Sequence, residues 1–81
     1  MPTPNHPAMP LCCQLAAQPG RYLFAQWLDA MQSSKKEFLI QAGACRLKGM
    51  LAAYVEMDAI SIGQHTAMVD EIHAFAFGAT V

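Results

Sequence analysis

The segment from residue 45 to residue 57 alternates between two kinds of side chain, and this alternation constrains the fold more than any other feature. Its even positions carry every charged residue of the segment, with Met50 and Ala52 as apolar exceptions. Its odd positions are all apolar or glycine, namely Cys45, Leu47, Gly49, Leu51, Ala53, Val55 and Met57. A period of two over this length is typical of a long β-strand with one buried face.

The segments on either side complete a mostly β prediction. Residues 22–32 form the best helix, because the apolar side chains Leu23, Phe24, Trp27, Leu28 and Met31 fall on one side of it. We expect a short strand at 37–42, a turn at Gly43 and the long strand over 44–57. The phase of the long strand continues through 58–62. Two last short strands are expected at 67–72 and 73–77.

A rival interpretation is all-helical. Ser34-x-x-Glu37 and Ser61-x-x-Gln64 are both capping-box patterns, which mark helix starts. Helices over 35–57 and 62–76 would then pack as a hairpin with the first helix. Against this, Gly43 and Gly49 would lie inside an exposed helix at a cost of about 1 kcal/mol each. The sequence favours strands, and both interpretations stay open.

Composition limits the function classes. The chain has 81 residues, 54% hydrophobic and 14% charged, with a net charge of −1. This length predicts one small domain, over residues 21–81, preceded by a proline-rich flexible leader over 1–20. A chain this apolar often completes its burial by self-association. The low net charge is not typical of a free-standing nucleic-acid binder, although a local basic patch is compatible with it.

The sequence contains no motif for several common classes of function. No apolar run is long enough for a membrane span, and no signal-peptide pattern precedes Leu11. The three cysteines, Cys12, Cys13 and Cys45, show no repeated spacing and predict a reduced, cytoplasmic protein. No catalytic, phosphate-binding or metal-binding motif is present, so we expect neither an enzyme nor a bound metal or cofactor.

Four segments in order resemble one family. They are WLDAM at 27–31, FLIQAGACRLKG at 38–49, YVEM at 54–57 and HAFA at 73–76. The order and spacing of these segments are similar to those of bacterial Hfq, the Sm-like RNA chaperone. The resemblance implies an N-terminal helix on a five-stranded, strongly bent antiparallel barrel, with Gly49 at the bend. It also implies a ring of subunits, six in this family, that joins the sheet edges.

The resemblance further implies contacts with single-stranded RNA. One face of the ring would use residues around the glycine turn, namely Ile40, Gln41, Ala44, Cys45, Arg46 and Lys48. The pore face would use Met57 and His73, although Asp70 and Glu71 beside His73 would repel phosphate. The rim would use Lys35 and Lys36 as point charges.

Three functions therefore remain as expectations. The first is a ring-forming, non-catalytic protein that binds single-stranded RNA. The second is a similar ring that has lost RNA binding and acts as a scaffold. The third follows from the helical interpretation and is an all-α adaptor that binds a protein partner.

Overall fold

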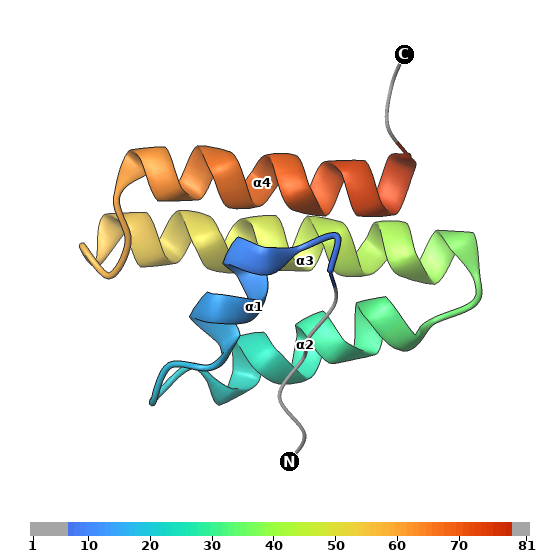
Figure 1. Ribbon diagram of the computed structural model, residues 1–81, viewed down its shortest axis with the longest axis horizontal. Coiled ribbons are helices and arrows are strands. Elements are labelled where there is room, and N and C mark those ends of the chain that lie inside the picture. Colours follow the sequence, from blue (N-terminus) through green and yellow to red (C-terminus); the bar gives the residue numbers. More distant parts are fainter. Residues whose placement is uncertain (1–6, 79–81) are drawn as a thin grey trace.

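The computed structural model describes residues 7–78, and every regular element in this range is an α-helix (Figure 1). The elements are α1 (Pro10–Ala16), α2 (Tyr22–Ser33), α3 (Glu37–Glu56) and α4 (Ile62–Phe77). The prediction of a mostly β, Sm-like barrel is therefore wrong. The helical interpretation has the right class, since its helices over 35–57 and 62–76 correspond to α3 and α4.

The three longer helices lie side by side in one layer, with α3 in the middle (Figure 1). The chain reverses direction between α2 and α3 and again between α3 and α4. The short α1 crosses one face of this layer and packs against α2 and α4 (Figure 1). Overall extents of 32 × 31 × 20 Å show that the molecule is flat. No other helix within residues 7–78 covers the opposite face.

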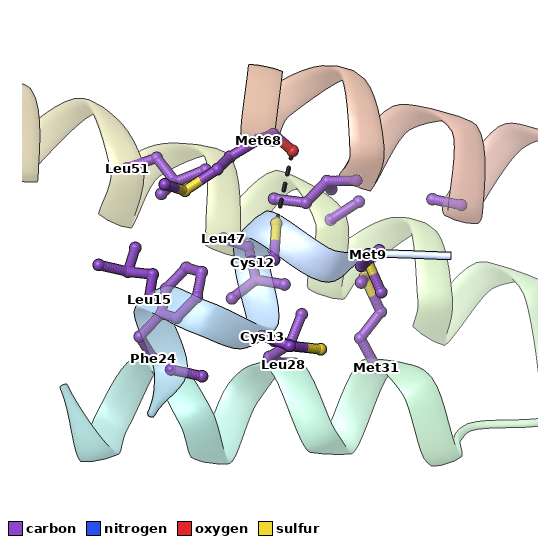
Figure 2. Close-up of a cluster of buried hydrophobic side chains, with 14 of the residues drawn as sticks. Met9, Cys12, Cys13, Leu15, Phe24, Leu28, Met31, Leu47, Leu51 and Met68 are labelled. Atoms are coloured by element: carbon purple, nitrogen blue, oxygen red, sulfur yellow. Dashed lines mark hydrogen bonds between the residues drawn. The ribbon is translucent and has the colours of Figure 1, made fainter. Parts of the chain in front are cut away.

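The core lies between this layer and α1. Each of the longer helices contributes one residue per turn at spacings of three or four, which is the period of a helix with one buried face. These residues are Phe24, Leu28 and Met31 from α2, Ala44, Leu47 and Leu51 from α3, and Met68, Ile72 and Ala76 from α4. Figure 2 shows Met9, Cys12 and Leu15 entering this cluster from the α1 segment.

A side chain of α4 holds α1 in place. The Glu71 carboxylate accepts the backbone N–H groups of Leu11 at 3.1 Å and Cys12 at 3.0 Å. Because α1 has no side-chain cap of its own, this contact satisfies donors that a helix start leaves unpaired. Residues 10–16 thus form a packed helix inside the segment predicted as a leader over 1–20. Residues 1–6 of that segment lie outside the described range.

Only one of the two predicted capping boxes is formed. At the start of α4, Gln64 N–H donates to Ser61 Oγ at 3.1 Å, and Ser61 N–H donates to Gln64 Oε1 at 2.8 Å. At the start of α3 the N-cap residue is Lys36, with no side-chain cap. Ser34 Oγ instead accepts the Lys36 N–H at 3.4 Å.

Two backbone hydrogen bonds close the end of α3, within the range where the strand prediction continued through 58–62. Ala59 N–H donates to the Tyr54 carbonyl at 2.8 Å and Asp58 N–H to the Val55 carbonyl at 3.0 Å. These two bonds form a Schellman motif, which requires a left-handed residue after the helix. Asp58 takes that role with φ of 59°. The chain can therefore reverse into α4 without a glycine.

The predicted strands at 37–42, 44–57, 67–72 and 73–77 all fall on α3 and α4. The alternation over 45–57 is a weak signal, because Met50, Ala52 and Tyr54 at even positions are also non-charged. The same residues also show a helical period of three and four. Ala44, Leu47 and Leu51 recur at this spacing, and none of the three has exposed surface (0% each). Burial of this row, at about 1.5–3 kcal/mol for each leucine, outweighs the helix penalty of two glycines.

Candidate functional site

A hollow of about 250 Å³ lies between α2 and α3 and is partly open to solvent. We call it the α2–α3 groove. Its walls are one row of side chains from each helix, and both rows are mainly apolar. The lining residues are Trp27, Ala30, Met31 and Ser34 from α2, with Leu39, Ala42, Gly43 and Arg46 from α3.

The floor of the groove is set by the closest approach of the two helices. A Cβ atom added to Gly43 would lie 3.2 Å from the Cβ of Met31, so α2 and α3 meet there with no room for a further methyl group. Helix axes approach closely where the contact residue is small. The larger side chains of Trp27 and Leu39 also line the hollow.

The wall of the groove carries a fixed positive charge. The Arg46 guanidinium carbon lies 4.0 Å from the centroid of the Trp27 ring, within cation–π distance. Within residues 7–78 this guanidinium has no carboxylate partner. On the other side of α3, the Lys48 ammonium lies 5.5 Å from the Phe77 ring centroid. Each cation is thus held over a ring of a neighbouring helix and stays available to an incoming anion.

The side of α3 that faces away from the core carries a regular row of exposed residues. Their spacing alternates between four and three residues, which is an average repeat of 3.5. We call this set the α3 outer row: Phe38, Ala42, Cys45, Gly49, Ala52 and Glu56. A Cβ added to Gly49 would meet nothing within 4 Å, so the middle of the row is open. No helix within the described part of the chain packs on it.

Four large apolar side chains of α2 and α3 are exposed in or near the sequence positions that line the groove. Phe38 is 65% exposed, Leu23 51%, Leu39 48% and Trp27 37%. Single exposed apolar residues are normal, but contiguous groups of them mark interaction surfaces in small proteins. Trp27 and Leu39 line the groove itself, Leu23 lies one turn before Trp27 on α2, and Phe38 directly precedes Leu39 on α3.

The titratable side chains do not assemble a reactive centre. Within residues 7–78 no three His, Cys, Asp or Glu side chains gather as metal ligands would. Burial, with a further contribution from Glu71, raises the pKa of the Cys12 thiol far above its ordinary value. That thiol therefore stays protonated, donates weakly to the Met68 carbonyl at 3.6 Å (Figure 2), and is a poor nucleophile.

The structure separates the residues predicted to contact RNA. Those of the first predicted face are distributed around α3: Ala44 is buried, Ile40, Gln41 and Lys48 are half-buried, and Cys45 and Arg46 are exposed. The Gln41 amide donates to Glu37 Oε1 at 3.3 Å. Both predicted ring faces depended on a sheet, which the described residues lack.

The other predicted contacts are also apart from one another. Met57 caps the end of α3, whereas His73 lies in the second half of α4 and stacks on Phe77 with centroids 4.9 Å apart. Eleven residues of helix, about 16 Å, separate His73 from the start of α4 at Ile62. Lys35 and Lys36 are exposed in the connection between α2 and α3.

The sequence prediction placed Leu23 and Trp27 on the same side of the helix as Phe24, Leu28 and Met31, and it did not predict the groove. Phe24, Leu28 and Met31 form the buried row of α2, while Leu23 and Trp27 form a second row one residue behind it. The signal was present in the width of the apolar stripe. Two parallel rows on one short helix are more than a single core contact needs.

Comparisons with known proteins do not assign the chain to a family: no family model, curated protein or solved structure matches it. In the described range, none of the helices combines the length and the hydropathy that crossing a bilayer requires.

Proposed function

We propose that this chain is a helical adaptor module that binds an apolar segment of a partner protein in the α2–α3 groove. The observation that supports the proposal most directly is the groove itself, bordered by Trp27, Leu39 and their exposed apolar neighbours. A reducing compartment such as the cytoplasm suits the three cysteines, none of which forms a disulfide bond.

The size of the groove favours an inserted side chain over a small-molecule ligand. Its 250 Å³ is below the range of about 300–1,000 Å³ that is usual for small-molecule sites, and it is not enclosed. Burying one leucine or phenylalanine side chain is worth about 1.5–3 kcal/mol. Several such contacts along α2 and α3 would give a micromolar complex, which is typical of transient adaptor interactions.

The aromatic ring in the groove provides both the binding contact and the means of measuring it. Trp27 is the single tryptophan of the chain, so a change in intrinsic fluorescence reports on the groove alone. Buried aromatic residues dominate the energetics of many interfaces. We expect truncation of Trp27 to remove most of the affinity.

The test is a selection of peptides from a displayed random library against the full chain. Selected peptides should bind with Kd of about 1–100 µM and change Trp27 fluorescence. Trp27→Ala should weaken binding at least about tenfold, measured with dye-labelled peptide. Tyr22→Ala is the matched control, because Tyr22 is an aromatic of the same helix that is 69% exposed and does not line the groove.

Two results would contradict the proposal. One is a selection that yields no binder. The other is a set of binders whose affinity is the same for Trp27→Ala and for the unchanged protein. A second readout is thiol protection: Cys45 is exposed beside the groove while Cys12 and Cys13 are buried, so a bound peptide should slow alkylation of Cys45.

A further inference from the structure

Positive charge lies at both ends of the α2–α3 groove. Arg46 lies over the Trp27 ring at one end, and Lys35 and Lys36 directly follow Ser34, which lines the other end. Trp27 and Ser34 are separated by about two turns of α2, a rise of about 10 Å. No aspartate or glutamate is among the described residues that line the groove. An apolar side chain with a carboxylate on each side would therefore complement it in shape and charge.

The acidic residues of α2 and α3 that are nearest to the groove in sequence lie on other sides of their helices. Asp29 is two residues from Trp27, and Glu37 is two residues from Leu39. Two residues subtend about 200° around a helix, so both carboxylates are directed away from the lining rows. Glu37 Oε1 also accepts the Gln41 amide at 3.3 Å. The charge at the groove is thus left for an occupant.

The chain itself carries an exposed apolar side chain between two carboxylates. Met57 is 63% exposed at the end of α3, and its neighbours Glu56 and Asp58 are also exposed. We call these three residues the α3 end turn. In the described range, no other large exposed apolar residue has an acidic residue on each side. Methionine is unbranched and adapts to pockets of irregular shape, which suits insertion into a shallow groove.

Backbone hydrogen bonds fix the shape of the α3 end turn. Met57 N–H donates to the Ala53 carbonyl at 3.0 Å, and the Schellman motif holds Asp58 at a φ of 59°. A segment that is already ordered loses less conformational entropy on binding than a flexible one. The turn therefore presents its apolar side chain and its two carboxylates at the end of a packed helix.

The α3 end turn does not reach the groove of its own chain. Met57 lies eleven residues beyond Arg46, about 16 Å along the axis of α3. The α2–α3 and α3–α4 connections lie at opposite ends of α3 (Figure 1). A contact between turn and groove therefore joins two copies head to tail. Such an interface is heterologous, because each copy uses one surface for one neighbour and a different surface for the next.

We infer that the α2–α3 groove of one copy binds the α3 end turn of a second copy. Met57 enters the groove, and the carboxylates of the turn face the cations at its ends. This inference rests on the proposed function and names the segment that the groove binds. One inserted side chain and a few screened ion pairs make a small interface, so we expect a Kd of about 0.1–1 mM.

Self-association of the full chain is measured by sedimentation equilibrium and by ¹⁵N–¹H spectra, from about 0.05 to 2 mM protein. Trp27 is the single tryptophan, so its indole N–H signal reports on the groove and should shift with protein concentration. Raising the salt concentration from about 0.05 M to 0.5 M should weaken the association at least about threefold, because the ion pairs are exposed to solvent.

Two variants that each lose one half of the interface provide the sharpest test. Trp27→Ala disables the groove and keeps the turn, whereas Met57→Ser disables the turn and keeps the groove. Each variant alone should stay monomeric, and an equimolar mixture should form dimers and nothing larger, because only one heterologous contact is restored. Tyr22→Ser is the matched control: Tyr22 is 69% exposed and lies outside the groove, so this variant should associate as the unchanged protein does.

A second pair of variants tests the charges of the turn. Glu56→Gln combined with Asp58→Asn removes both carboxylates and keeps the backbone shape, since asparagine also tolerates the left-handed region. Self-association at low salt should weaken at least about threefold. Asp29→Asn combined with Asp70→Asn is the control. It changes net charge by the same amount at two exposed residues outside the turn, and it should not weaken association.

The possible failures are distinguishable. A chain that stays monomeric at about 2 mM would overturn the second-copy inference, and the peptide selection would then decide the proposed function by itself. Association that persists in Trp27→Ala or in Met57→Ser alone, or that mixing these variants does not restore, would place the contact elsewhere and also overturn the inference. Selected groove-binding peptides that dissociate the mixed dimer would support both proposals.

Discussion

Alanine substitution at the two interior glycines of α3 separates helix propensity from packing. Replacing glycine by alanine inside a helix raises the free energy of unfolding by about 0.8–1.0 kcal/mol when nothing else changes. At Gly49 an added Cβ meets nothing within 4 Å. We therefore expect Gly49→Ala to stabilise the fold by about 1 kcal/mol, the full propensity gain.

Replacing Gly43 by alanine brings the same gain in helix propensity as at Gly49, but at Gly43 the added Cβ meets a neighbouring side chain. An added Cβ there lies 3.2 Å from Met31 Cβ and 3.4 Å from Met31 Cγ. Met31 is buried and its Cβ is attached directly to the α2 backbone, so rotation of the side chain does not relieve the contact. Overpacking of this kind costs about 1–3 kcal/mol. Gly43→Ala should be neutral or destabilising by up to about 2 kcal/mol.

Urea unfolding followed by circular dichroism measures the difference. The urea concentrations at the unfolding midpoints of Gly43→Ala and Gly49→Ala should differ, while the slope m stays the same for both. Neither substitution changes the surface exposed on unfolding, which determines m. In thermal unfolding, a gain of about 1 kcal/mol corresponds to a rise in Tm of about 4–8 °C for a domain of this size. If Gly43→Ala stabilises as much as Gly49→Ala, α2 and α3 do not meet at Gly43 and the groove floor described above is incorrect.

Three further substitutions test other contacts of the fold. Ser61→Ala removes the formed capping box and should lower the free energy of unfolding by about 1 kcal/mol, whereas Ser34→Ala should change it by less than about 0.5 kcal/mol in the same urea titration. Glu71→Gln weakens the bonds to the start of α1 and should cost about 1–2 kcal/mol, with faster amide exchange in α1; Asp70→Asn, at the exposed neighbour, should leave both unchanged. The folded state keeps the Cys12 proton, because its pKa is raised, while the unfolded chain loses that proton above about pH 9. Stability should therefore fall with rising pH in that range by about 1.4 kcal/mol per unit, and Cys12→Ala should remove this part of the slope.

The sequence predicted α2 closely, over 22–32 against the observed Tyr22–Ser33. Its apolar residues recur only at helical spacing, so no other period competes. In α3 two periods coexist, because alanine, methionine and glycine fit either face of a strand and any side of a helix. The burial of one side of α3 selects the helical period over the strand period. That burial depends on contacts with Phe24, Leu28 and Met31 of α2, which the local sequence pattern of α3 does not contain.

The candidate site was harder to predict because helical geometry changes which residues are neighbours. Arg46 and Lys48 are two residues apart, so a strand would place them on one face, as the predicted RNA surface required. On a helix two residues subtend about 200°, and the same cations stand on opposite sides of α3. The two cations that the strand prediction placed on one RNA-binding face therefore lie over rings of two different helices, Arg46 over Trp27 of α2 and Lys48 over Phe77 of α4.

The uncovered face of α3 follows from the lengths of the helices. A layer of three helices has two faces, and within residues 7–78 one of them is covered by the seven residues of α1 alone. The uncovered side of α3 is only partly polar, since its row of exposed residues contains Glu56 and otherwise Phe38 and small side chains. The outer row reduces the cost by using small residues, which expose little apolar area to water. The centre of this face therefore exposes little apolar surface although no described helix covers it.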